Sequence, residues 1–567
     1  MSFRTSLFGK ILQGAGEKLL QAAAEELTRA AADAKARQSA ETSDARSFGR
    51  RDLGSQRSGG GFRRAGSPPP VAEKVSVVLR RQVPVRFEEP PRSWIGGRPM
   101  MPDDVVWPIA LNSEYPERGR CPLHFVAQIA CADLPTELWG GLGPRTGWLL
   151  LFLSGEDWDV MSNKEALQVL HIAELGPEQE PPPNIGPVHN ELYTGPDYKF
   201  VRSQDDVPGE WRHWPVDLIT IPNRPIENDD ARLTVIPDDF ASTLYDGAPV
   251  SPDQRVSAPP QPPFSWRGAL YVIDSIIRSL SITRSLPKLS LRSGDREKIE
   301  AAGWFETTIA ALDGAAAKWL ESPGWRIANE AVPDDVEAEA KRLERRAAIQ
   351  KRLDRIAKVR ALLVRVDRPD ALWSFLESSI EDYLAWRSAA IERVWALRQE
   401  VLAHDLDSRL PEADWARLRD ILTAGRQEYW FLGNHHDIES MSPIPTATSL
   451  LQLGESGLQA ALVQIAADYH TRSPELRALI PPALIVSLEP QWRQLYNNRP
   501  HRMGGIHDAI QSDPRPGPRS DVLLFQIATD DAMHWVWGDT GAYYAFIGTD
   551  RLASADFSKI DASFENH

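Results

Sequence analysis

The chain has 567 residues, of which 42% are hydrophobic and 25% are charged, and its formal net charge is −15 at pH 7. This composition is ordinary for a globular protein, and the length predicts two to four domains. No apolar run approaches the roughly 18 residues of a transmembrane helix, and the start lacks the apolar segment of a secretory signal peptide. With only two cysteines, which we expect to be buried thiols, a cytoplasmic location is predicted.

The charge is unevenly distributed along the chain. Residues 1–70 contain 12 Lys and Arg against 7 Asp and Glu, so the remainder carries a net charge of −20. An acidic body repels phosphate backbones, and we therefore expect no nucleic-acid binding by the folded part. The basic stretch 46–64 could still contact an acidic surface.

The first 74 residues are predicted to form a tethered helix. Residues 5–36 place apolar side chains at helical spacing, which predicts an amphipathic N-terminal helix within 1–37. It would pack on its own protein or self-associate, or else lie on a membrane surface or bind a partner. Residues 38–74 are rich in Ser, Gly, Arg and Pro, so we expect a disordered linker.

Strand patterns follow the linker. Apolar residues occupy odd positions between 75 and 90, and Pro84 inside that run predicts an edge position or a break between two short strands. Further strands are predicted at 123–129 and 148–153. The proline-rich stretch 176–295 is expected to be irregular, with short strand-like pieces at 218–221 and 233–236 and a short helix-like piece near 238–245.

From 295 to 430 the pattern is helical. Pro333, Asp334 and Asp335 form a helix start, and apolar residues then recur at helical spacing as far as Leu363. A break at 368–370 precedes a second stripe that reaches Val401. Two helices of about 30 residues joined by a tight turn are expected to pack as an antiparallel, coiled-coil-like hairpin.

Two distant segments share one order of motifs, and each predicts a loop, a strand, a loop and a strand. The first has Gly96-Gly97, then Gln128-Ile129, then Gly147 with Phe152; the second has Gly504-Gly505, then Gln526-Ile527, then Gly541 with Phe546. We interpret them as an internal duplication whose copies pair as pseudo-symmetric halves of one sheet core.

The same two regions, about 75–175 and 495–567, resemble the YwqG-like family. The matching motifs are Gly97-Arg-Pro99, Trp107-Pro108, Pro122-Leu123, Ala127-Gln128-Ile129, Asp133-Leu134-Pro135 and Gly147 to Phe152 in the first, and His501-Arg-Met-Gly504-Gly505, Leu524-Phe-Gln526-Ile527, Trp535-Val-Trp537-Gly538-Asp539 and Asp556-Phe557-Ser558 in the second. They cover under a third of the chain, and the long helical insertion departs from the short family form.

The resemblance implies an α+β body, residues 75–294 and 431–567, split by a helical insertion at 295–430. It implies no settled activity, cofactor or catalytic residue. Some relatives look associated with toxin systems between bacteria, which implies an immunity or partner-binding role.

Candidate ligand-binding residues gather in the closing region. Trp535 and Trp537 beside Asp539 suit a sugar, a peptide or a cation, although such a run also fits a core strand with a tight turn. His501 before Gly504 and Gly505 could act as a base or contact a phosphate, or could bond to the loop backbone.

Other polar clusters carry weaker signals. His435-His436-Asp437 with Glu439 lacks metal-ligand spacing and is expected in an exposed loop, and Asp530-Asp531 with Asp539 is expected to form an acidic turn rather than a carboxylate pair for acid–base chemistry. We find no dinucleotide, phosphate-loop, serine-nucleophile or zinc motif in the sequence. No catalytic residue, metal ligand or cofactor is therefore predicted.

Three functions remain open at this point. The first is a bacterial-type protein-interaction or scaffold protein that presents the insertion and the N-terminal helix to a partner of unknown identity. The second is an enzyme or small-ligand binder with a pocket between the two halves, where Gln128, Gln526, Trp537 and Asp539 would converge. The third is a membrane-surface adaptor that binds through residues 5–36.

Overall fold

The computed structural model describes residues 75–566 except for 113–115, 155–159, 161–162, 187, 189–208, 224–260, 282–292, 331–335, 435–440, 456, 494–498, 512–513 and 517–520. The predicted N-terminal helix and linker, the pieces at 233–236 and 238–245, and the His435 cluster lie outside the described residues. The described part belongs to one compact unit, Pro69–His567. Among its helices, none combines the length and the apolar character that crossing a membrane requires.

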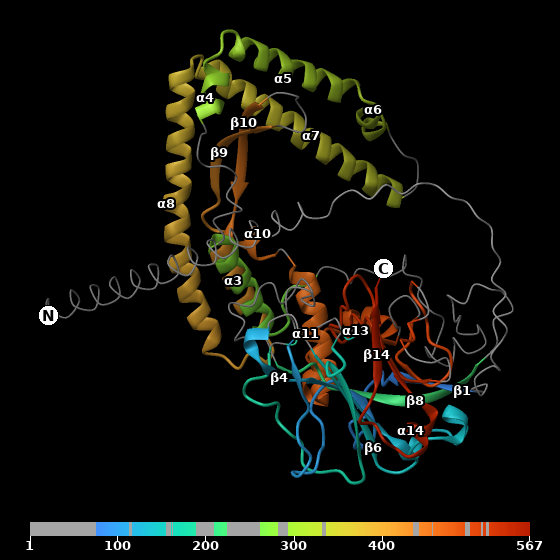
Figure 1. Ribbon diagram of the computed structural model, residues 1–567. Coiled ribbons are helices and arrows are strands. Elements are labelled where there is room, and N and C mark those ends of the chain that lie inside the picture. Colours follow the sequence, from blue (N-terminus) through green and yellow to red (C-terminus); the bar gives the residue numbers. More distant parts are fainter. Residues whose placement is uncertain are drawn as a thin grey trace, which may run out of the picture. The chain divides into compact units, whose positions relative to one another are not determined.

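The body is built on a ten-stranded sheet in which every neighbouring pair is antiparallel. Its order is β14-β13-β12-β11-β1-β8-β2-β5-β6-β7. Figure 1 labels β1, β6, β8 and β14 of this sheet. The strands are β1 (Val75–Arg81), β2 (Trp94–Ile95), β5 (His124–Ala130), β6 (Trp148–Leu153), β7 (Leu167–Ile172), β8 (Trp214–Pro222), β11 (Arg502–Met503), β12 (Val522–Ala528), β13 (Ala542–Ile547) and β14 (Asp561–Glu565). A separate hairpin pairs β3 (Ile109–Leu111) with β4 (Arg120–Pro122).

The central pair β1–β8 separates two wings of four strands each. The N-terminal wing contains β2, β5, β6 and β7 and is attached to β8, whereas the C-terminal wing contains β11 to β14 and is attached to β1. Strand β1 therefore lies in the middle of the sheet. The edge position predicted near Pro84 is wrong, because β1 pairs with β11 on one side and β8 on the other. The alternative, a break between two short strands, holds only for its first part, because β1 ends at Arg81 and no strand follows in residues 82–90.

The two wings pair their strands in the same register. Gln128 lies opposite Trp94 on one side and Leu150 on the other. Gln526 takes the equivalent place between Arg502 and Tyr544. Each central strand also has a register shift just before its glutamine, between Phe125 and Ala127 and between Leu523 and Phe525.

Each glutamine holds the loop that follows its glycine pair. The Gln128 side-chain oxygen accepts from the Met100 backbone N–H at 2.9 Å, and that of Gln526 accepts from the Asp508 N–H at 2.8 Å. Both acceptors are fully buried, and both N–H groups belong to the third residue after the second glycine. A buried amide bonded to backbone groups fixes the path of a loop, because leaving those groups unpaired costs about 1–3 kcal/mol.

The glycine pairs are required by close backbone approach. All four glycines have positive φ, between 62° and 72°. A Cβ on Gly96 would lie 2.1 Å from the Arg212 carbonyl oxygen, and one on Gly505 would lie 2.0 Å from the Ser76 hydroxyl. Only glycine combines this left-handed conformation with such contacts.

Helices cover the sheet and complete the main core. These are α3 (Trp266–Ser281), α10 (Leu450–Gly454), α11 (Leu458–Arg472), α12 (Pro474–Arg477), α13 (Pro482–Arg493) and α14 (Thr549–Ala553). Val272, Ile273 and Ile276 of α3 are buried in the same cluster as Leu462 of α11 and Val77 of β1. The expectation of an irregular chain throughout 176–295 is therefore wrong for α3, whose amphipathic pattern stands directly after a proline-rich stretch.

The middle of the chain forms an arm, residues 293–448, that has a core of its own. Its elements are α4 (Ser293–Glu300), α5 (Trp304–Glu321), α6 (Pro323–Asn329), α7 (Val336–Arg365), α8 (Pro369–Leu402), α9 (Glu412–Thr423), β9 (Gln427–Asn434) and β10 (Met441–Thr448). Leu312, Ile356, Leu363 and Leu376 are buried together in this second cluster.

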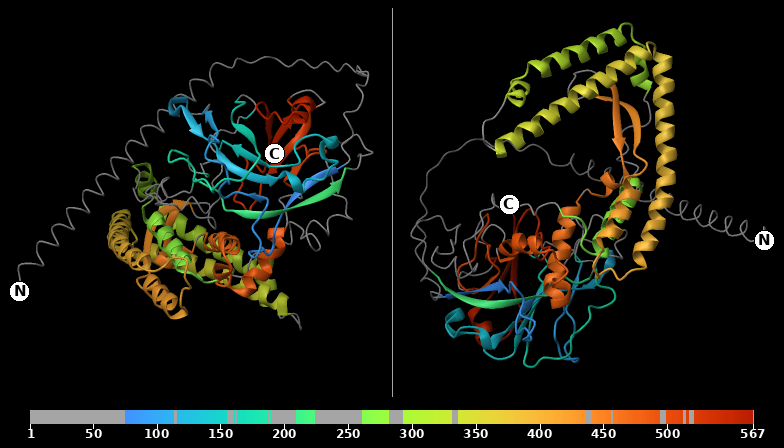
Figure 2. Two further views of the ribbon diagram at one scale, coloured as in Figure 1. Left: turned by 90° about the horizontal axis from the view of Figure 1, so that it is seen from below. Right: turned by 180° about the vertical axis from the view of Figure 1, so that it is seen from behind.

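Helices α7 and α8 occur where the two stripes predicted them, but the predicted antiparallel hairpin does not form. Helix α7 packs against α5, α6 and β10, whereas α8 packs against β9 and α3. The two helices diverge from their shared turn, as Figures 1 and 2 show. The β9–β10 ribbon takes the apolar contacts that each stripe would otherwise have made with the other helix.

Candidate functional site

A cavity of about 900 Å³ lies between the N-terminal wing, the helices and the loop after β12. Its walls come from four parts of the chain that are distant in sequence. The lining residues are Pro90, Pro91, Trp94, Gly97, Arg98, Met100, Glu178, Glu210, Trp211, Arg212, His213, Arg267, Gln464, Ile465, Asp468, Arg472, Met533 and His534.

One wall is the glycine turn of the N-terminal wing. The Gly97 N–H donates to the Trp211 carbonyl at 2.8 Å, which joins this turn to the segment before β8. Arg98 follows and binds Glu210 through two nitrogens, at 2.7 and 3.3 Å. The hydrogen bonds that Arg98 donates to Glu210 raise the pKa of Arg98, so this guanidinium stays charged and held in place.

Arg212 connects the opposite walls of the cavity. Its guanidinium donates to the Ala532 carbonyl and, at 3.2 Å, to both the backbone and the side-chain oxygen of Gln464 on α11. The Gln464 amide in turn donates to the Asp531 carbonyl at 3.3 Å. These bonds tie the loop after β12 to the helix that faces it.

The Asp407 carboxylate lies behind the cavity wall that α3 and α11 form, and it holds two of the arginines that line the cavity. The Asp407 carboxylate accepts from Arg267 at 2.7 Å, from Arg472 at 2.9 Å and from the Tyr469 hydroxyl at 3.0 Å. Burial acts to raise the pKa of Asp407, but the hydrogen bonds from the two arginines outweigh it and lower the pKa to about 2. Both arginines are therefore kept charged at the cavity.

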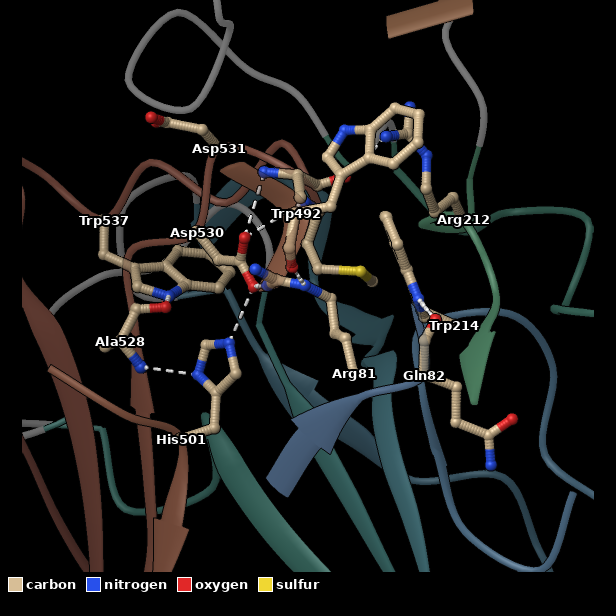
Figure 3. A network of polar contacts seen from close by, with 12 residues as sticks. Arg81, Gln82, Arg212, Trp214, Trp492, His501, Ala528, Asp530, Asp531 and Trp537 are labelled. Atoms are coloured by element: carbon tan, nitrogen blue, oxygen red, sulfur yellow. Dashed lines mark hydrogen bonds and ion pairs between the residues drawn. The ribbon is translucent and has the colours of Figure 1, made fainter. Parts of the chain in front are cut away.

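A buried ionic network supports the loop after β12 (Figure 3). The Asp530 carboxylate accepts from the Arg81 guanidinium and, at 2.9 Å, from the His501 Nε2–H, while its other oxygen accepts from the Ala532 N–H at 2.9 Å. All three charged or titratable side chains are buried. The network joins the end of β1, the residue before β11 and the loop that supplies Met533 and His534 to the cavity.

The protonation of this network follows from its hydrogen bonds. The His501 Nδ1 accepts from the Ala528 N–H at 3.1 Å, so its proton is on Nε2. Burial, and then the nearby charge of Arg81, lower the pKa of His501 to about 3. Burial also lowers the pKa of Arg81 to about 9, which leaves it charged at neutral pH beside Asp530.

The predicted site residues take places other than the cavity wall. Gln128 and Gln526 are buried and bond to loop backbone groups. The Gly504 N–H donates to the Leu523 carbonyl at 3.0 Å, and Gly505 lies against Ser76 of β1 and Asn223. Trp535 and Trp537 are buried, and each meets the edge of Trp211 at a ring-centroid distance of 5.8 Å. His501 bonds to the Ala528 N–H at the end of β12 and to Asp530, and Asp539 is exposed. None of the eight is among the described residues that line the cavity.

The glycine motif that lines the cavity is the one in the opening region, at Gly97 and Arg98. In the sequence, Gly97 and Arg98 mark the family motif and Gly97 the repeat, whereas the predicted candidate site lies at the counterparts around Gly505. A search of both copies for charged residues next to the glycine pair would have found Arg98. Arg212, Arg267 and Arg472 give no local signal, because only the fold brings them together.

The wings also differ at the ionic network. The position equivalent to His501 is Ser93, whose hydroxyl accepts from the Ala130 N–H at 3.0 Å, as His501 accepts from Ala528. The position equivalent to Asp530 is Ala132. The carboxylate–histidine pair is thus a property of the C-terminal wing. Among the described residues, no group of three or more His, Cys, Asp or Glu side chains is arranged to hold a metal ion.

The strands of both wings lie within a match to one protein family. Residues 93–233 and 434–565 match the model of DUF1963, a domain of unknown function. The DUF1963 match is compatible with the YwqG-like resemblance and describes a domain in two parts with a helical region between them. Its second part begins at 434, so β10 and α10 to α13 belong to it. No curated protein matches the chain.

Replacing Asp530 tests the buried network. We expect Asp530→Asn to lower the free energy of unfolding by about 3–5 kcal/mol, because Arg81 is left charged and buried without its carboxylate. Asp104 of the N-terminal wing is exposed, and Asp104→Asn should change stability by no more than about 0.5 kcal/mol. Urea unfolding of the three proteins measures this. Equal effects of the two substitutions would contradict the assignment.

The low pKa of His501 gives a pH dependence with a definite sign. Between pH about 6.5 and 3 the unfolded chain binds a proton at this residue and the folded chain does not, so stability falls as pH is lowered through this window. His501 is expected to contribute about 1.4 kcal/mol per pH unit to the slope of the unfolding free energy against pH. His501→Gln should reduce the slope by that amount between pH 6 and 5, as measured by urea unfolding. An unchanged slope would show that His501 is protonated in the folded protein.

Proposed function

We propose that the sheet body is a binding module whose ligand is a small polar compound held in the 900 Å³ cavity. The observation that carries this proposal is the cavity itself, whose volume lies in the range of small-molecule sites, about 300–1,000 Å³. Its lining combines apolar surface from Trp94, Met100 and Ile465 with guanidinium groups and carboxylates. A ligand with both apolar and charged parts fits such walls.

The polar groups of the cavity support binding more than catalysis. Arg98, Arg212, Arg267 and Arg472 are each held by an acceptor, so they are oriented before any ligand arrives. Burial lowers the pKa of His213 to about 4, which makes it a neutral hydrogen-bonding group at pH 7. The His501–Asp530 pair is buried and engaged with Arg81, so we give it a supporting role.

The two wings also support an origin by duplication. They share a register, a bulge, a glutamine clamp and a glycine pair, and we infer that one four-stranded unit gave rise to both. In this interpretation the copies then diverged. The N-terminal wing presents its glycine turn to the cavity, and the C-terminal wing contributes the loop that the ionic network holds.

Blocking the cavity tests the ligand proposal. In a thermal-shift screen of polar metabolites, we expect at least one compound to raise the unfolding temperature of the protein. Asp468→Trp, which puts an indole into the cavity, should weaken the affinity for that compound at least tenfold. Ala460→Trp on the exposed side of the same helix is the control and should leave affinity unchanged. Equal stabilisation of all three proteins would place the ligand elsewhere.

A second function, protein interaction through the arm, is favoured by a separate observation. The arm has its own buried core and exposes large apolar side chains on its long helices, with Leu343 and Val364 of α7 at 49% and 56% exposure and Leu384 of α8 at 39%. We propose that these helices form a partner surface, as expected for a scaffold protein.

Site-specific photo-crosslinking in cells tests the arm without damaging the fold. Deleting both long helices, residues 334–404, would not be a clean test of the arm, because Val394 and Val401 of α8 belong to the main core. A photoreactive residue at Leu343 or Leu384 should yield an adduct with one protein, whereas the same group at Val106 of the body, which is 82% exposed, should not. Adducts at Val106 alone would refute the arm as the partner surface.

A further inference from the structure

Helix α7 is strongly basic in an acidic chain. Its 30 residues contain ten Lys and Arg against four Asp and Glu, although the whole chain carries a net charge of −15. The helix is about 45 Å long at 1.5 Å per residue. Because exposed charges farther apart than about 8–10 Å are screened at physiological salt, a partner at α7 responds to this helix and its neighbours rather than to the charge of the body.

Part of this basic charge is already neutralised within the arm. Arg342 pairs with Glu339 at 2.6 Å, Arg360 pairs with Asp313 at 2.6 Å, and Lys358 pairs with Glu428. Other basic residues of α7 are not used in this way. Arg345, Arg346 and Lys351 are exposed and make no hydrogen bond, ion pair or ring contact within the described part of the chain.

The elements beside α7 limit the width of the basic surface. Helix α5, which packs along α7, carries three acidic residues against one lysine, whereas α6, which also packs on α7, carries one arginine and no acidic residue. The other side of α7 is buried, with Ile349, Ile356 and Val359 packed in the arm. The free basic residues therefore lie along one side of a single helix.

We propose that the exposed side of α7 docks an acidic segment of a partner protein. A strip of positive charge along one helix, with the acids of α5 at its edge, attracts a single acidic helix or extended segment. A broad anionic surface such as a duplex or a bilayer is disfavoured, because its phosphates would also face the acids of α5. This inference rests on the arm as a partner surface and adds the chemistry of the partner.

Fluorescence anisotropy of the full chain tests it with defined probes. The probes are a labelled glutamate-rich helical peptide of the same 30-residue length as α7 and a DNA duplex of similar length. We expect the peptide to bind at about 0.05 M salt and to be released at about 0.3 M. Arg345→Glu with Arg346→Glu and Lys351→Glu should weaken peptide binding about tenfold.

A matched control separates the α7 surface from net charge. Arg393→Glu with Arg419→Glu and Lys559→Glu changes the net charge by the same amount at exposed positions outside α7 and should leave affinity within about twofold of the wild type. Circular dichroism melting should give the same transition for all three proteins, since every substituted side chain is exposed.

Several results would overturn the proposal. They are equal weakening by both triple variants, no peptide binding at low salt, tighter binding of the duplex or of phosphatidylserine vesicles than of the peptide, and self-association in ultracentrifugation that the α7 variant abolishes. Crosslinks at Leu384 without peptide binding would leave the arm as a partner surface and remove only the acidic segment.

Discussion

The carboxylate of Asp530 is the constraint on which the centre of this protein depends. An ionised carboxylate inside a core is tolerated only when charge and hydrogen bonds compensate it, and here Arg81, His501 and a backbone N–H do so. Because these partners come from β1, from the residue before β11 and from the loop itself, satisfying one charge fixes three segments at once. The position of the cavity wall at Met533 and His534 follows from that requirement.

Helix α8 couples the body to the arm. Its first turns bury Leu372 and Leu376 in the core of the arm, whereas its last turns bury Val394 and Val401 in the main core. One helix of 34 residues thus belongs to two hydrophobic clusters. A protein partner on the arm and a ligand in the cavity would therefore act on regions joined by a continuous, packed element rather than by a loose linker.

Local sequence patterns predicted helices and strands well where apolar, buried positions recur at regular spacing along the chain. The strand predicted at 148–153 is β6, Trp148–Leu153, because a continuous apolar run bounded by turn residues has one simple solution. The apolar stripe that ends at Leu363 and the one that reaches Val401 likewise correspond to α7, Val336–Arg365, and α8, Pro369–Leu402. The predicted hairpin does not form, because an apolar stripe indicates that one face of a helix is buried but does not indicate which element covers that face. Here the β9–β10 ribbon and α5 compete for the same faces.

The candidate site, too, could be predicted from the sequence only in part. From the sequence alone came the paired glycines, the two glutamines and their order, since these depend on backbone conformation and local hydrogen bonds. The sequence also indicated that Trp535 and Trp537 could be core residues, as they are. Only the tertiary structure decided which copy faces a cavity and which arginines meet there. Guanidinium groups at 98, 212, 267 and 472 come together through sheet pairing and helix packing, which are long-range contacts that no local pattern records.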